Sequence, residues 1–184
     1  MSFTFRRVVT GHADDGRAIV HSDEQLDSEP RNAGYEARVA WSTSQFPPSN
    51  DVVDDAERGP RGGRVLVRTG ELIPGESDVP SMHRTETQDI AVVVSGTLDM
   101  VLDSGAVVER LGPGDIVVQR GTMHQWVARG TEPVRVVFVL MDSEPVRIGD
   151  RLLREDVSVF EGRLSPMPRA ADEAFPVESG RRTS

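Results

Sequence analysis

One histidine, a carboxylate and a second histidine lie in or beside short apolar runs that are separated by glycine turns. His83 comes first, Asp89 opens the next apolar run, and His124 follows a turn at Gly121. Imidazole nitrogens and carboxylate oxygens are protein ligands that divalent transition metals accept. The chain has no cysteine, so no thiolate can contribute to a metal site or act as a nucleophile. These residues therefore indicate a metal pocket built between β-strands.

Side-chain alternation predicts which of these residues share a face. Successive side chains of a β-strand point to opposite faces, so residues of one parity lie together. If the chain is extended here, His83, Thr85 and Asp89 point into the same cavity. His124 and Trp126 likewise share a face of their own strand. The two sets meet only if the strands enclose a common interior.

The strand pattern from residue 64 to 141 supplies such an interior. Short runs rich in Val, Ile and Leu are divided by glycine and proline turns, among them Pro74-Gly75, Ser95-Gly96 and Gly112-Pro113-Gly114. Regular turns with no helical pattern between them favour an antiparallel sandwich or barrel. We therefore predict an all-β fold whose barrel occupies residues 64–141.

The flanking segments are predicted to be a β-rich N-terminal extension over 1–63 and a C-terminal segment and tail over 142–184. Two β-type runs around Asp14-Asp15-Gly16 predict a hairpin, and Tyr35 to Ser42 predicts a further strand. The stretch from Phe46 to Gly63 has the composition of a loop. Residues 148–155 suit a short helix or a strand equally, and from Leu164 onward the composition predicts a weakly ordered tail.

Composition excludes several classes of function. The net charge is −9 and all 21 basic residues are arginine, so a nucleic-acid surface is not expected and Schiff-base lysine chemistry is excluded. The sequence contains no long apolar run and no apolar leader after the first methionine. We expect a cytoplasmic protein without a membrane segment.

The residues around both histidines resemble the two motifs of the cupin superfamily. In the first motif, His83 takes the place of the first histidine, Asp89 that of the glutamate and Gly96 that of the closing glycine. In the second, Gln119-Arg120-Gly121 precedes His124 at the motif's spacing. The resemblance covers roughly residues 64–141 and implies a double-stranded β-helix, or jelly-roll barrel. It also implies a homodimer, as in most small members.

The chain departs from both motifs in ways that change the ligand set. Thr85 stands where the second histidine is usual, and Ala128 stands where the second motif has asparagine. The remaining set, His83, Asp89 and His124, has two histidines and one carboxylate. Such a set suits Fe(II) and leaves positions open for substrate or dioxygen, while Zn(II), Ni(II) and Mn(II) are chemically acceptable. We predict these residues as the ligands of a divalent metal cofactor.

Other residues are candidates for the walls of the site. Trp126 and Met123 flank His124, and Leu98 and Met100 alternate toward the interior of their strand. Together with Thr85 they form the predicted substrate pocket, although Trp126 is equally compatible with a core aromatic. Arginine offers a two-pronged donor for a substrate carboxylate or remains solvated on the surface. The candidates for that role are Arg68, Arg84 and Arg120.

Three functions fit these residues, and each has a small-molecule partner. The first is a metal-dependent lyase, dehydratase, decarboxylase or isomerase, in which a Lewis acid facilitates proton loss beside a carbonyl or phenolate oxygen. The second is a non-haem Fe(II) dioxygenase. The third is a non-catalytic small-molecule-binding protein. No general acid or base is assigned, and motifs for nucleotide binding and for serine hydrolysis are absent from the sequence.

Overall fold

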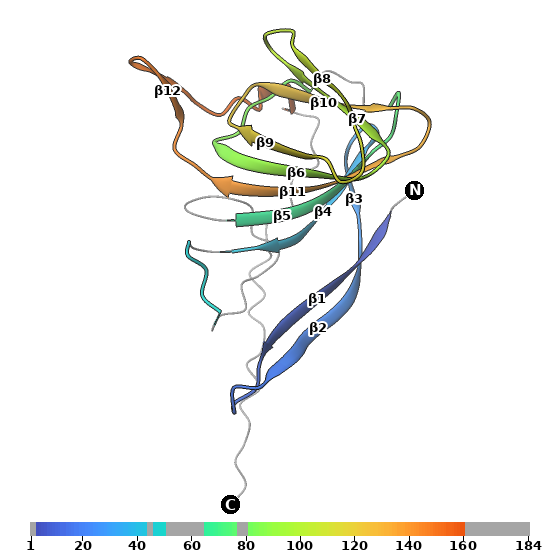
Figure 1. Cartoon of the computed structure of the whole chain (residues 1–184), viewed down its shortest axis with the longest axis vertical. Coiled ribbons are helices and arrows are strands. Elements are labelled where there is room, and N and C mark those ends of the chain that lie inside the picture. The colour runs from blue at the N-terminus through green and yellow to red at the C-terminus, as the bar shows by residue number, and fades with distance from the viewer. Residues whose placement is uncertain (1–2, 44–45, 51–64, 77–80, 161–184) are drawn as a thin grey trace, which may run out of the picture.

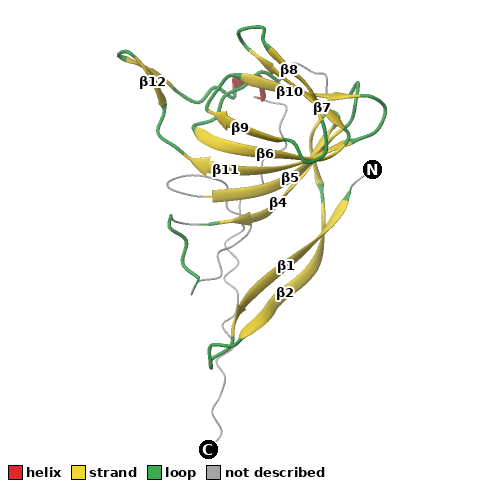
Figure 2. Cartoon of the chain, viewed as in Figure 1, coloured by secondary structure: helices red, strands yellow, loops and turns green. Residues whose placement is uncertain are grey.

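A computed structural model describes residues 3–43, 46–50, 65–76 and 81–160. In this part of the chain, strands make up nearly all of the regular structure, with a single short 3-10 turn at Ser158–Phe160 (Figure 2). No helix within those ranges has the length and apolar character needed to cross a membrane. The strands, in chain order, are β1 Thr4–His12, β2 Ala18–Asp27, β3 Glu29–Asn32, β4 Tyr35–Ser42, β5 Val65–Leu72, β6 Thr87–Ser95, β7 Thr97–Leu102, β8 Val107–Leu111, β9 Ile116–Arg120, β10 His124–Arg129, β11 Val134–Asp142, β12 Val146–Ile148 and β13 Arg151–Leu153.

Two antiparallel sheets enclose one core (Figure 1). The larger sheet has the strand order β3-β4-β5-β11-β6-β9, and the smaller has the order β10-β7-β8. Residues from both sheets form a single cluster of buried apolar side chains. The fold is all-β, and the paired sheets form a double-stranded β-helix, so the predicted fold class is confirmed.

The interior changes from apolar at one end to polar at the other. At the apolar end, Val136 on β11 lies opposite Val93 on β6, and both are almost fully buried. Further along the same pair of strands, Leu140 lies opposite Asp89, which in turn pairs with Gln119 on β9. Strand alternation turns all of these side chains inward. The fold therefore places the buried polar side chains of Asp89 and Gln119 together at one end.

The segments that flank the barrel contain β-strands as well as loops. The hairpin around Asp14-Asp15-Gly16 is present as β1 and β2, which extend away from the barrel, and Gly16 has a φ of 82° that suits the turn (Figure 1). The predicted strand at Tyr35–Ser42 is confirmed as β4, which pairs with β5 and continues the larger sheet. Of the two alternatives for residues 148–155, the strand is correct. The tail from Leu164 lies outside the described residues.

Candidate functional site

His83 and His124 meet at the polar end of the barrel. Main-chain hydrogen bonds of 2.9 and 3.0 Å join the two residues in both directions, with His124 at the start of β10. Their ring centroids are 4.4 Å apart. His124 is only 2% exposed, whereas His83 is half-buried. One imidazole is therefore held in the interior while the other keeps access to solvent.

The Nδ1 atom of each ring is engaged by the main chain. His83 Nδ1 lies 2.7 Å from the carbonyl oxygen of Ser81, and His124 Nδ1 lies 3.1 Å from that of Thr122. A carbonyl oxygen only accepts hydrogen bonds, so the contact with Ser81 favours the proton on Nδ1 of His83 and the lone pair on its Nε2. The amide nitrogen of Gln119 lies 2.7 Å from His124 Nδ1, and because an amide NH2 group only donates, this shorter contact favours the lone pair on Nδ1 of His124 and the proton on its Nε2. Nε2 of His83 is thus oriented to accept a hydrogen bond, and Nε2 of His124 to donate one.

Burial favours the neutral form of both imidazoles. Desolvation lowers the pKa of His83, and the positive charge of Arg68 acts in the same direction. The pKa of His124 is lowered to about 4, first by burial and then by the neighbouring His83. At neutral pH, neutral His83 can therefore accept a proton or bind a metal ion through Nε2, and neutral His124 can donate a hydrogen bond from Nε2.

Asp89 reaches the same interior from the other sheet. It is 7% exposed, and its Oδ1 atom has no hydrogen-bond partner among the described residues. Burial raises the pKa of the carboxyl group, against the opposing effects of a hydrogen bond from Thr87 and the charge of Arg68. Thr85, where a second histidine is usual, has its hydroxyl 2.7 Å from that of Thr87. The ionised form of Asp89 is therefore destabilised by the fold.

Replacing Asp89 with asparagine should make the protein more stable at pH 7. The raised pKa means that ionised Asp89 lowers folding stability, and a neutral amide removes that charge. We expect thermal unfolding to show a midpoint about 2–4 °C higher. The matched control is Asp99→Asn, because Arg129 bonds the Asp99 carboxylate at 2.6 Å and the pKa of Asp99 is lowered. That variant should unfold at a lower temperature, and equal shifts in both variants would contradict this account.

The three predicted metal ligands do not converge on one point. His83 bridges to β10 of the smaller sheet, whereas Asp89 belongs to the larger sheet, and the chain bends between them at Glu86. Alternation holds only within a continuous strand, so the bend breaks the parity that relates the two residues. No three His, Asp or Glu side chains of the described ranges lie close enough to hold one ion. The two imidazoles suit a transition metal, but the three-ligand set does not fit as its side chains stand.

Arg68 is a charged residue whose field reaches both histidines and Asp89. It lies on β5 directly opposite Phe138 of β11, with its guanidinium carbon 5.3 Å from the ring centroid. Its charge influences the pKa of both histidines and of Asp89. The sequence alone did not distinguish it from two other candidate arginines. We call the following residues the polar cluster: Arg68, His83, Asp89, Gln119 and His124.

Comparison with known proteins identifies the family. The model of the cupin domain matches residues 68–140. The cupin-domain-containing oxidoreductase fogC of Aspergillus ruber is 32% identical over 177 residues, which cover 86% of this chain and 85% of that protein. The chain belongs to the cupin superfamily. The cupin-domain-containing oxidoreductase virC of Hypocrea virens is 30% identical over 155 residues, covering 78% of this chain and 79% of that protein. A solved Klebsiella pneumoniae protein with a double-stranded β-helix domain has a TM-score of 0.45 and 22% identity, covering 62% of this chain and 83% of that one, a likeness that concerns the fold alone.

The residues predicted to line the substrate pocket of this cupin lie at different depths. Trp126 stands beside His124, with ring centroids 5.5 Å apart, and is also part of the buried core. Met100 and Leu98 lie deeper in that core and are 7% and 0% exposed. Met123 is half-buried and precedes β10, so its side chain follows the opposite parity from His124. Trp126 is therefore a core aromatic, and its role in a substrate pocket stays a prediction.

The segment after the barrel covers one side of His83, which sequence reasoning missed. The ring of Phe160 lies edge-on to His83 at a centroid distance of 4.9 Å. Two main-chain hydrogen bonds of 2.9 Å between Arg84 and Asp156 hold this segment against the strand that carries His83. No local pattern signals this contact, because the two segments are far apart in the sequence.

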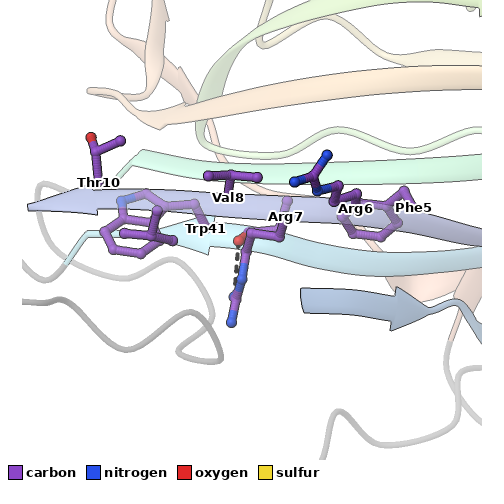
Figure 3. A pocket seen from close by; sticks show the side chains of 8 residues that line it. Phe5, Arg6, Arg7, Val8, Thr10 and Trp41 are labelled. Atoms are coloured by element: carbon purple, nitrogen blue, oxygen red, sulfur yellow. Dashed lines mark hydrogen bonds between the residues drawn. The ribbon is translucent and has the colours of Figure 1, made fainter. Parts of the chain in front are cut away.

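A groove of about 430 Å³ lies between β1 and β4, lined by residues outside the polar cluster (Figure 3). Its charged groups already have partners. Arg6 pairs with Asp23 at 2.6 Å, and Arg7 donates to the carbonyl oxygen of Ala40 at 3.1 Å. We assign this groove no chemistry. Its lining residues are Phe5, Arg6, Arg7, Val8, Val9, Thr10, Ala40 and Trp41.

Proposed function

We propose that this cupin is an enzyme that acts on a small organic substrate by proton transfer, in lyase or isomerase chemistry. One observation carries the proposal. His83 and His124 have their rings 4.4 Å apart, with His83 Nδ1 2.7 Å from the carbonyl oxygen of Ser81 and His124 Nδ1 2.7 Å from the amide nitrogen of Gln119. A neutral imidazole that accepts at Nε2 beside one that donates at Nε2 is suited to general acid-base catalysis.

The polar cluster supplies a group for each part of such a reaction. The half-buried His83 is the accessible base, and its Nε2 takes a proton from the carbon beside a substrate carbonyl. The electron pair of the broken C–H bond moves into the carbonyl, which becomes an enolate oxygen. The guanidinium of Arg68 stabilises the negative charge that forms there. Return of the proton to a different carbon of the enolate system gives isomerisation. In elimination, the enolate electrons re-form the carbonyl and a C=C bond, the bond from the neighbouring carbon to the leaving group breaks, and the proton passes to that group.

The proposal predicts hydrogen exchange that depends on both histidines. Deuterium uptake from D2O beside the carbonyl is followed by NMR for a panel of small 2-oxo acids and 1,3-dicarbonyl compounds. We expect His83→Gln and His124→Gln each to slow this exchange by about 10²-fold or more. Gln125→Ala, which changes the residue facing away from His124 on β10, should keep the wild-type rate. The proposal fails if no compound exchanges faster than in buffer, or if both histidine variants retain the rate.

Oxidoreductase activity is the second candidate, because the relatives fogC and virC carry that description. It requires a redox partner such as Fe(II), for which Nε2 of His83 and His124 are the available imidazole ligands. Metal analysis of protein purified without a histidine tag, with His124→Ala as the control, tests whether an ion is retained. Oxygen consumption with added Fe(II) then separates dioxygenase from lyase or isomerase activity.

Binding without catalysis is the third candidate, and protein without metal or exchange activity would favour it. A divalent ion, if retained, would act as a Lewis acid beside a carbonyl or phenolate oxygen. The homodimer and the cytoplasmic location expected from the sequence stay predictions. A small organic molecule remains the expected partner in all three cases.

A further inference from the structure

Buried polar atoms without partners gather in the polar cluster. Within the described ranges, four buried side-chain atoms have no hydrogen-bond partner: Arg68 Nε, Arg84 Nε, Asp89 Oδ1 and Gln119 Oε1. Leaving such an atom without a partner destabilises the folded state, so folded proteins contain few of them. Three of the four belong to the polar cluster, at the end of the barrel that also holds both histidines. This concentration indicates a place where a ligand completes the hydrogen bonding.

Strand register brings these three side chains to the same wall of the interior. Asp89 and Gln119 are direct partners across β6 and β9. Arg68 lies opposite Phe138, and Phe138 lies opposite Ala91, which is the next inward residue after Asp89 on β6. The three polar side chains therefore occupy neighbouring rows of one sheet and face the same space as His124.

The unmet hydrogen-bonding capacity has a defined polarity. Arg68 offers donors only, and its guanidinium is held over the ring of Phe138 at 5.3 Å. Asp89 Oδ1 and Gln119 Oε1 offer acceptors to a ligand. The complementary ligand has an anionic oxygen group for the arginine and a hydroxyl hydrogen for one of the two oxygens. Arg68 is half-buried, so a ligand can approach it from solvent.

We propose that the polar cluster binds small hydroxy-substituted carboxylates, with Arg68 holding the carboxylate and either Asp89 or Gln119 accepting the hydroxyl hydrogen. This inference names the substrate class of the site and rests on the proposed function only for the reaction that follows binding. The other two candidate arginines have different surroundings. Arg84 bonds through its main chain to Asp156, and Arg120 is exposed on the outer face of β9.

Calorimetry with a matched pair of probes tests the proposal. The probes are 2-hydroxybenzoate and the neutral 2-hydroxybenzamide, which have similar shapes, and the protein is treated with EDTA. Wild-type protein should bind the carboxylate at least tenfold more tightly than the amide. Arg68→Gln should abolish this preference and leave affinity for the amide within twofold. Arg120→Gln, the same substitution on the outer face, should retain the wild-type preference.

Two further measurements complete the test. The first uses wild-type protein, so it does not depend on the folding of a variant, and the second separates the binding proposal from the catalytic proposal. In wild-type protein, the Nε–H resonance of Arg68 should shift when 2-hydroxybenzoate is added and stay in place with the amide. His124→Gln should keep the Arg68-dependent preference even though its hydrogen exchange is slow. A preference that persists when no exchange occurs overturns the proposed function alone. Equal binding of both probes by wild-type protein, or an unchanged preference in Arg68→Gln, overturns the substrate class.

Discussion

Between pH 7 and pH 4, the protein should lose about 3 kcal/mol of folding free energy through His124 alone, an estimate from about 1.4 kcal/mol per pKa unit. The cause is that burial lowers the pKa of this imidazole from 6.5 to about 4. His124 is 2% exposed, so little solvent screening reduces the effect. Chemical denaturation at a series of pH values, after EDTA treatment to remove any bound ion, measures the slope.

The sign follows from the protons that each state binds. Between about pH 6.5 and 4, unfolded His124 is protonated while folded His124 is not, so acid favours unfolding. His83 contributes in the same direction, because burial lowers its pKa too. Asp89 acts oppositely, because its raised pKa makes the folded state bind a proton before the unfolded state does. The net result in this window is a loss of stability as the pH falls.

The His124→Gln variant is the control for this slope. Glutamine is neutral throughout the window, so the variant should lose most of the pH dependence even if it is less stable at pH 7. The pKa of Asp99 is lowered below its ordinary value, so that carboxylate affects stability only at the acid end of the range. An unchanged slope in His124→Gln would show that other groups control acid unfolding.

The fold was largely predictable because its turns depend on local backbone chemistry. Gly96 has a φ of 80°, and a Cβ atom there would lie 2.8 Å from the side chain of Val134. Such a position favours glycine strongly, and the sequence therefore marks the turn between β6 and β7. Membership of β4 in the larger sheet depends instead on its pairing with β5 across a long intervening segment. Local alternation predicts a strand but does not identify its partner.

The geometry of the candidate site was predictable only for residues that lie on the same strand. His124 and Trp126 share a face because both lie on β10. The same rule relates His83 to Asp89 only if the chain stays extended, and the bend at Glu86 sends the two residues to different sheets. The bend is set by pairing across the barrel, which the local sequence does not encode.

The inward position of Arg68 had a signal in the sequence, namely its parity along β5. Leu66, Arg68 and Leu72 alternate along β5, so the strand turns an arginine toward an otherwise apolar interior. An arginine that faces the interior of a sheet is uncommon without a partner or a function. What alternation did not reveal is that Phe138 lies directly opposite, because that register is set by the pairing of β5 with β11.

Replacing Phe138 with alanine should lower the free energy of unfolding by about 3–5 kcal/mol, the usual result of deleting a buried aromatic ring. Phe138 is 5% exposed and packs against Trp126 at a centroid distance of 5.9 Å, so the cavity would open in the centre of the core. Urea denaturation measures the loss. Val139→Ala, one residue along β11 and half-buried on its outer side, should cost only about 1 kcal/mol. Equal losses in the two variants would place the core elsewhere.

Phe138→Leu separates the packing role of the ring from its contact with Arg68. Leucine refills much of the volume, so stability should fall by less than about 1.5 kcal/mol. The guanidinium then loses the aromatic face that holds it at 5.3 Å. A cation–π contact of about 0.5–1 kcal/mol corresponds to a loss of about two- to fivefold in the preference for 2-hydroxybenzoate over its amide. If the preference is unchanged, the strand backbone alone positions Arg68, and Phe138 contributes only packing.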